Sequence, residues 1–88
     1  MRIITFGTFD LFHIGHINIL KRAKELGDEL IVGVSTDKFT FSKKNRNALF
    51  NENERKKILE SIKFVDEVFF EESFEKKRQY ILENKADV

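Results

Sequence analysis

One stretch near the N-terminus constrains this chain more than any other. An apolar run at residues 3–6 ends at Gly7, and after a short loop an amphipathic segment opens at Gly15. A strand, a glycine turn and a helix start place unpaired backbone amides and the positive end of a helix dipole at one point. Such a point attracts anions, and a residue without a side chain lets them approach the backbone. The stretch therefore predicts an anion site between His13 and His16.

Apolar and amphipathic segments alternate along the rest of the chain. Continuous apolar runs predict buried strands over residues 2–6, 30–35 and 67–70. Apolar residues at helical spacing predict helices over residues 15–26, 51–62 and 74–84, with a helical turn at 38–39 and a mobile loop over 42–50. A strand–helix–strand order implies parallel strands joined by right-handed crossovers. We therefore expect an α/β fold, a Rossmann-like doubly wound parallel sheet.

Several element ends carry their own signals. Gly27 is expected at the C′ position of the first helix. Asn51, with Glu54 three residues on, predicts a capping box for a later helix. Ser73 is expected to cap the last helix, and residues 86–88 resemble the start of a fourth strand.

Composition limits the class of protein. The 88 residues suffice for one small domain, and a net charge of +1 gives no global field toward nucleic acid or membrane. There are no cysteines, which excludes disulfides and thiolate metal sites. No apolar run approaches the roughly 20 residues of a membrane span, and no signal-peptide pattern is present. We expect a cytoplasmic protein whose partners are neither nucleic acid nor membrane.

The string GTFDLFHIGH at residues 7–16 resembles the HxGH nucleotidyltransferase superfamily. Within it, the cytidylyltransferase family is most similar, through STDKF at residues 35–39, Arg55 and VDEV at residues 65–68. The resemblance covers residues 2–88. It implies a sheet of order 3-2-1-4-5 with the nucleotide between strands 1 and 4. This chain supplies the order 3-2-1, cut short before strands 4 and 5, so residues 1–88 are expected to be the N-terminal part of a single nucleotidyltransferase domain.

The cut sheet carries a consequence for assembly. Strand 1, central in the resembled family, would be an exposed apolar edge, and such edges pair with other chains. We expect self-association through residues 2–6, as a homodimer or a larger assembly. Light scattering that shows a strict monomer at high concentration would count against this.

The resemblance also assigns roles to residues. His13 and His16 would be catalytic, donating hydrogen bonds to the α- and β-phosphates. The positions that match nucleotide contacts are Gly7, Thr8, Phe9, Asp10, His13, Ile14, Gly15, His16, Arg46, Arg55 and Lys63. Those that match acceptor contacts are Lys43 and Lys77. The chain departs from the family pattern at Asn45, where a lysine is usual, at Lys63, where an arginine is usual, and at Phe74, where a tryptophan is usual.

Structural alternatives stand beside these roles. The histidines would otherwise be one surface and one capping residue, and Phe9 would fill the core. Asp10 would orient its loop by accepting hydrogen bonds from local amides or from His13, or would help to hold Mg²⁺ through water. Asp37 would cap the turn that follows it.

The basic residues and one carboxylate have alternatives as well. Lys43, Lys44 and Arg46 would form a solvated charge run, and Lys77 would be an ordinary surface lysine. Asp66 is expected to stabilise the turn into the third strand, where Arg55 could pair with it.

The expected activity is transfer of CMP from CTP to a small phosphorylated acceptor with release of pyrophosphate. Glycerol 3-phosphate, giving CDP-glycerol, is the default acceptor, and Mg²⁺ is expected to accompany the triphosphate. Two alternatives remain open at this stage. One is an adenylyltransferase of the same superfamily, and the other is a non-catalytic module that binds nucleotide or self-associates.

Overall fold

A computed structural model describes residues 1–10, 12–44, 48–73 and 75–86. Three parallel strands form one sheet of order β1-β2-β3, with β1 at Arg2–Gly7, β2 at Glu29–Ser35 and β3 at Glu67–Glu71. This confirms the α/β class, the Rossmann-like sheet and the order 3-2-1. β1 and β3 each run one residue past their predicted carboxyl ends, and β2 begins one residue earlier than predicted and ends where predicted.

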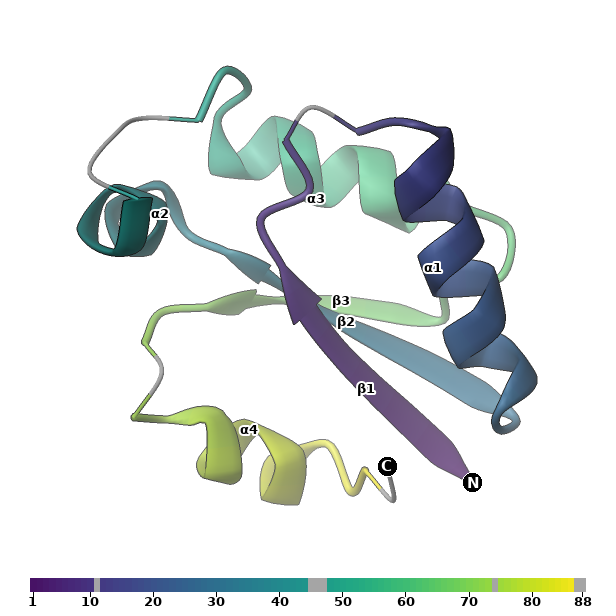
Figure 1. The fold of residues 1–88 in the computed structure, drawn as a ribbon. Coiled ribbons are helices and arrows are strands. Elements are labelled where there is room, and N and C mark those ends of the chain that lie inside the picture. Colours follow the sequence, from purple (N-terminus) through teal and green to yellow (C-terminus); the bar gives the residue numbers. More distant parts are fainter. Residues whose placement is uncertain (11, 45–47, 74, 87–88) are drawn as a thin grey trace.

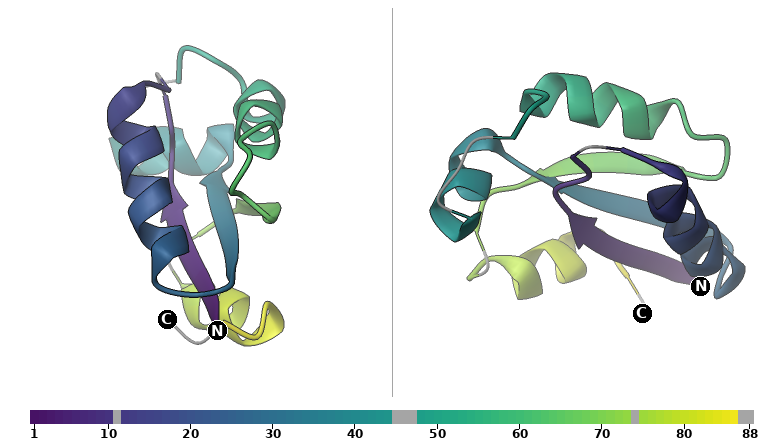
Figure 2. Two further views of the ribbon diagram at one scale, coloured as in Figure 1. Left: turned by 90° about the vertical axis from the view of Figure 1, so that its right-hand side faces the viewer. Right: turned by 45° about the horizontal axis from the view of Figure 1, so that its top comes forward.

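Helices cover both faces of the sheet (Figures 1 and 2). The helices α1, Ile14–Glu25, and α3, Glu52–Glu60, lie on one face, and α4, Lys77–Glu83, lies on the other. The core between the sheet and α1 and α3 consists of fully or nearly fully buried side chains from all of these layers: Ile3, Phe9, Leu20, Leu30, Val32, Val34 and Leu59. On the opposite face the rings of Phe6 and Phe69 contact Tyr80 of α4.

The helices α1 and α3 form where the capping residues predicted them, and a helix also forms where a turn and the start of a loop were expected. Asn51 makes the predicted capping box with Glu54, and Gly27 stands at C′ after the C-cap Leu26. The expected turn at 38–39 is the helix α2, Asp37–Lys44, so the predicted loop is wrong for its first three residues. Thr36 explains the longer helix, because its Oγ1 accepts the Phe39 amide at 3.1 Å in the manner of an N-cap.

The last helix is shorter than predicted. It begins at Lys77 after the N-cap Lys76, which makes no side-chain capping bond, so the prediction that Ser73 caps it is wrong. Phe74 lies outside the described residues, and so does most of the fourth strand predicted at 86–88. Within the described residues, no helix combines the length and the apolar character that a membrane span requires.

This architecture gathers four segments at the carboxyl ends of the strands. The β1–α1 loop, the start of α2, residues 48–51 and the start of α3 all lie at that end of the sheet (Figure 1). In parallel α/β sheets this is the edge where ligands bind.

Candidate functional site

The two histidines lie against each other at the start of α1. His13 is the N-cap residue, with extended backbone at φ −145° and ψ 179°, and its Nδ1 accepts the Gly15 amide at 3.0 Å. The His13 amide in turn donates to His16 Nδ1 at 3.2 Å, which completes a capping box. The imidazole rings stack with centroids 4.1 Å apart and planes 29° apart. The predicted pairing of the two rings at the strand-to-helix turn is therefore present.

These capping bonds decide which ring nitrogen faces outward. Each Nδ1 accepts a backbone N–H, so the neutral ring carries its proton on Nε2. Nε2–H is then the donor that each ring can offer to a bound anion, beside the amides of the helix start. The site presents two donors that point away from the capping bonds, close to the positive end of the helix dipole.

Gly15 is required by the His13 ring. A Cβ at position 15 would lie 2.7 Å from His13 Cε1, closer than such atoms approach in proteins. Any other residue here would push the ring off its capping bond. The glycine that the sequence suggested as space for an anion also makes room for the imidazole. Ile14, beside it, is 69% exposed at the first position of α1.

The Phe9 ring packs against the ring of the second histidine, His16. Its φ of 55° is left-handed, a conformation that an aromatic residue adopts at a cost in strain. Its ring is buried and meets the His16 ring edge-on at a centroid distance of 5.4 Å, and Phe12 lies at the same distance from His16. A Cβ at Gly7 would lie 2.9 Å from this ring. Phe9 therefore does fill the core, and it also fixes His16 in place.

Thr8 contributes a buried polar atom. The residue is 7% exposed, and within the described part of the chain its Oγ1 has no hydrogen-bond partner. A buried hydroxyl without a partner costs free energy that a ligand atom at hydrogen-bonding distance would recover. This places Thr8 among the residues suited to contact a ligand, as the resemblance implies.

Asp10 holds a segment that is distant from it in the sequence. Its Oδ2 accepts the Leu49 amide at 2.6 Å and its Oδ1 accepts the Phe50 amide at 3.0 Å. Asp10 does accept amide hydrogen bonds, but the expectation that these amides are local is wrong, because they lie 39 and 40 residues along the chain. The carboxylate ties the β1–α1 loop to the segment before α3.

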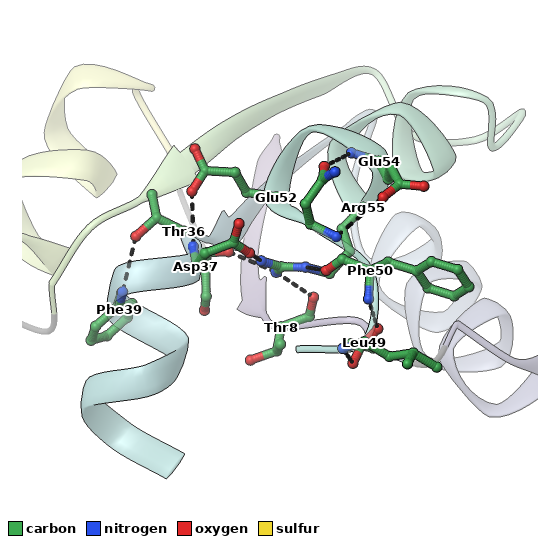
Figure 3. A network of polar contacts seen from close by, with 12 residues as sticks. Thr8, Thr36, Asp37, Phe39, Leu49, Phe50, Glu52, Glu54 and Arg55 are labelled. Carbon is green, nitrogen blue, oxygen red and sulfur yellow. Dashed lines mark hydrogen bonds and ion pairs between the residues drawn. The ribbon is translucent and has the colours of Figure 1, made fainter. Parts of the chain in front are cut away.

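Arg55 lies at the centre of the polar network at the carboxyl edge (Figure 3). The residue is 1% exposed and donates to the carbonyl oxygens of Phe50, Thr8 and Ser35 at 2.9, 3.0 and 2.7 Å. Its Nη2 lies 2.6 Å from Asp37 Oδ1. The suggested pairing of Arg55 with Asp66 is wrong, because α3 directs the guanidinium toward the carboxyl edge while Asp66 lies at the other end of the sheet.

Asp37 opens α2, and its role is shared with Glu52. The Asp37 amide donates to Glu52 Oε1 at 2.8 Å, and the Asp37 carboxylate accepts from Arg55. The cap of α2 comes from Thr36 instead. Asp37 therefore belongs to the Arg55 network and is not the cap of the turn that follows it.

The comparisons with known proteins agree with this geometry. The profile of the family described as Cytidylyltransferase-like matches residues 4–88. The chain belongs to the cytidylyltransferase-like family. It is 49% identical over 87 residues to a glycerol-3-phosphate cytidylyltransferase of Bacillus subtilis, covering 99% of this chain and 67% of that protein. It is 41% identical over 88 residues to an FAD synthase of Pyrococcus abyssi, covering 100% of this chain and 60% of that protein.

A solved structure shares the fold. The lipopolysaccharide core biosynthesis protein of Thermoplasma volcanium superposes with a TM-score of 0.88 at 34% identity, over 99% of this chain and 70% of that one. The chain spans about two thirds of the length of the glycerol-3-phosphate cytidylyltransferases among its relatives. By family it is thus a cytidylyltransferase-like nucleotidyltransferase.

One basic residue named for the nucleotide site, Lys63, lies away from the histidines. Lys63 is exposed in the connection from α3 to β3, near the amino ends of the strands, because the Asp66 amide that follows it donates to the Leu30 carbonyl. One copy of the chain does not bring Lys63 to His13. Lys43 falls in the last turn of α2, where side chains are not described, and Arg46 lies outside the described residues. Their assignments stay predictions.

Lys77 lies beneath the sheet with a partner that the sequence did not reveal. Its Nζ is 3.6 Å from Glu71 Oε2 and 4.8 Å from the centroid of the Phe6 ring. Glu71 ends β3 and is 1% exposed, and its Oε1 lies 3.5 Å from Ser35 Oγ. The sequence does contain a hint of this pair, because Glu71 is a carboxylate at the end of the apolar strand EVFFE. Treating Lys77 as an ordinary surface lysine leaves that carboxylate unexplained.

The described side chains do not form a metal cage. Among the residues that the structure describes, no group of three or more histidine or carboxylate side chains is arranged around one point. The oxygens of Asp10 already accept two amides, and one oxygen of Asp37 accepts from a guanidinium. These residues do not fit a resident Mg²⁺ centre.

Proposed function

We propose that the protein transfers CMP from CTP to a small phosphorylated acceptor, with glycerol 3-phosphate as the default and CDP-glycerol as the product. The stacked His13–His16 pair at the start of α1 is the observation that carries the proposal. The likeness to glycerol-3-phosphate cytidylyltransferases over nearly the whole chain supports the choice of CTP and of the acceptor.

The reaction needs positioning and charge stabilisation more than covalent chemistry. An oxygen of the acceptor phosphate attacks the α-phosphorus of the nucleotide, a new P–O bond forms, and the bond to the β-phosphate oxygen breaks as pyrophosphate leaves. The Nε2–H groups of His13 and His16 donate to phosphate oxygens on which negative charge develops. The buried Thr8 hydroxyl and the amides at the start of α1 supply further donors.

Positive charge comes from outside the histidine pair. Lys77, at the carboxyl edge beneath the sheet, would hold the acceptor phosphate together with Lys43, and Arg46 would meet the nucleotide. A Mg²⁺ ion would arrive with the triphosphate, whose oxygens would be its ligands, because the residues that the structure describes build no cage for it. Bound there, it would neutralise phosphate charge.

An adenylyltransferase is the second candidate. FAD synthases match the chain at 48% over 68 residues and at 41% over 88 residues, close to the identity of the glycerol-3-phosphate cytidylyltransferases. A non-catalytic module that binds nucleotide or self-associates is the third. In support of self-association, β1 has β2 as its only neighbour among the described strands, and the light-scattering measurement named above tests it.

Pyrophosphate release separates these candidates. The chain, and a version extended to the length of its relatives, would be incubated with CTP or ATP and with glycerol 3-phosphate, other phosphorylated polyols, phosphocholine, phosphoethanolamine or FMN. The proposal expects release with CTP and a phosphorylated polyol. Release with ATP and FMN alone would favour the adenylyltransferase. No release from the extended protein with CTP and any acceptor would refute the proposal.

The histidines give the sharpest test of the mechanism. His13→Ala and His16→Ala should each lower kcat by about two orders of magnitude or more, the scale of losing one donor to a developing oxyanion. Asn18→Ala is the matched control, since Asn18 is exposed one turn further along α1. Circular dichroism would confirm that the variants remain folded. A loss below about ten-fold would reduce the pair to helix capping.

A further inference from the structure

The Arg55 side chain uses its donors inside the protein. A guanidinium has five N–H donors, and four hydrogen bonds to Phe50, Thr8, Ser35 and Asp37 span 2.6 to 3.0 Å. The side chain has no exposed surface, whereas the partner Asp37 is 45% exposed. At most one N–H direction remains for a ligand, and the burial of the group keeps a phosphate from approaching it as a free cation would.

The acceptors of these bonds come from separate segments. Thr8 follows β1, Ser35 ends β2, Asp37 opens α2, and Phe50 precedes α3. Figure 3 labels Thr8, Asp37 and Phe50 around Arg55. Phe50 is held twice, because its carbonyl accepts from Arg55 and its amide donates to Asp10. One buried cation and one carboxylate thereby set the spacing of the segments that surround the candidate site.

The contact with Thr8 bears directly on the histidines. The Thr8 carbonyl belongs to the peptide unit that precedes Phe9, the residue with φ 55°. A strained backbone conformation persists only where its surroundings fix it, and the bond from Arg55 fixes that peptide plane. The Phe9 ring in turn meets the His16 ring at 5.4 Å. A chain of contacts thus runs from the guanidinium to the imidazole.

We propose that Arg55 is a positioning residue that sets the β1–α1 loop and, through Phe9, the His16 ring, and that it does not itself contact the nucleotide. This differs from the direct contact that the family resemblance implies. The inference rests on the proposed function for its consequence in catalysis. Its structural part, the fixing of the loop in the unliganded protein, does not depend on any substrate.

The test measures amide hydrogen exchange in the unliganded protein. Arg55→Lys keeps the positive charge but cannot reach three carbonyls and a carboxylate at once. The exchange protection of the Leu49 and Phe50 amides, which donate to Asp10, should fall about ten-fold or more, and that of the amides around Phe9 should fall with it. Arg22→Lys, an exposed substitution on α1, is the matched control and should leave all of these amides unchanged.

Kinetics of the extended protein add a readout that a direct contact would move differently. Loss of positioning lowers kcat because the histidine donors are misplaced, whereas loss of a ground-state contact raises KM for the nucleotide. We expect Arg55→Lys to lower kcat at least about ten-fold with a smaller change in KM. If the protein proves inactive with every substrate, the exchange experiment still decides the positioning role.

A measurement on the unaltered protein covers the case in which Arg55→Lys fails to fold. The Arg55 Nε–H proton should exchange with water far more slowly, by NMR, than those of the exposed Arg22 and Arg78, and added CTP or ATP should leave its resonance in place. Exchange as fast as that of Arg22 would overturn the proposal. So would unchanged amide protection in Arg55→Lys together with weaker nucleotide binding, which would restore the direct contact.

Discussion

Two buried charged residues lie at the carboxyl edge of the same sheet, and they differ in how closely they are paired. Arg55, above the sheet, has four acceptors within 3.0 Å. Glu71, below it, has its nearest polar neighbours at 3.5 and 3.6 Å, and its Oε2 makes no hydrogen bond within the described chain. Both residues are 1% exposed. A buried charge that is fully paired holds a structure together, whereas one that is poorly paired costs stability and is retained for another reason.

For Glu71 we expect that reason to be the lysine beside it. Lys77 is 39% exposed, so its ammonium stands between the buried carboxylate and solvent, over the face of the Phe6 ring. A carboxylate that holds the lysine at this distance keeps the cation at the edge without binding it tightly. The upper charge is thus suited to fixing loops, and the lower one to presenting a cation.

The largest expected effect is the removal of the upper charge. Arg55→Met keeps much of the volume but leaves the Thr8, Ser35 and Phe50 carbonyls without their donor. We expect the free energy of unfolding to fall by about 3–5 kcal/mol, a large share of the roughly 5 kcal/mol at the lower end of domain stability. Urea unfolding followed by circular dichroism measures this, with Arg22→Met as the exposed control. A loss below about 1 kcal/mol would mean that water replaces the guanidinium freely.

The sequence was most informative about local structure. Strand positions followed from continuous apolar runs, and the His13–His16 pairing followed from a glycine and two histidines at one helix start. Such local patterns decide local structure, because backbone propensity and capping act within a few residues. The capping box of Asn51 and Glu54 was predictable on the same ground.

Contacts between distant segments could not be read in this way. No residue near Asp10 in the sequence indicates that its carboxylate accepts amides about 40 residues away. The pairing of Arg55 with Asp66 was suggested because the two residues are oppositely charged and near in sequence, but the partner is Asp37. The direction of α3, set by packing of Leu59 into the core, decides which end of the sheet Arg55 reaches. The helix at 37–44 was predicted only as a turn at 38–39, because the Thr36 cap is a single residue before a mixed polar segment.

A smaller effect is expected from neutralising the lower charge. Glu71→Gln removes a buried carboxylate that lacks close donors, so the free energy of unfolding should stay constant or rise by up to about 1 kcal/mol. Urea unfolding would compare it with Glu72→Gln, the exposed neighbour. A loss of about 2 kcal/mol or more would show that Glu71 is paired as firmly as Arg55, and the comparison between the two charges would fail.

The smallest effect concerns a carboxylate that is well paired but partly exposed. Asp66 Oδ2 accepts from Lys24 Nζ and from the Leu30 amide, each at 2.7 Å. The hydrogen bond from Lys24, followed by that from the Leu30 amide, lowers the pKa of Asp66 from its ordinary value of 3.8. A lowered folded-state pKa contributes stability that is fully present above 3.8 and is lost as pH falls through the lowered pKa.

Asp66→Asn should therefore be less stable than the unaltered protein at neutral pH, and the gap should close below the ordinary pKa of 3.8. Thermal unfolding at a series of pH values from about 7 to about 2.5 measures the gap. Asp28→Asn is the control with the stronger salt response. The N-terminal ammonium lowers the pKa of Asp28, but its side chain is 88% exposed, so its contribution should vanish in about 1 M salt while that of Asp66 is partly retained. If the difference in stability between Asp66→Asn and the unaltered protein stays constant with pH, the hydrogen bonds of Asp66 persist when its carboxyl is protonated. Pairing would then not determine the contribution of a surface charge in the way that it is expected to distinguish Arg55 from Glu71.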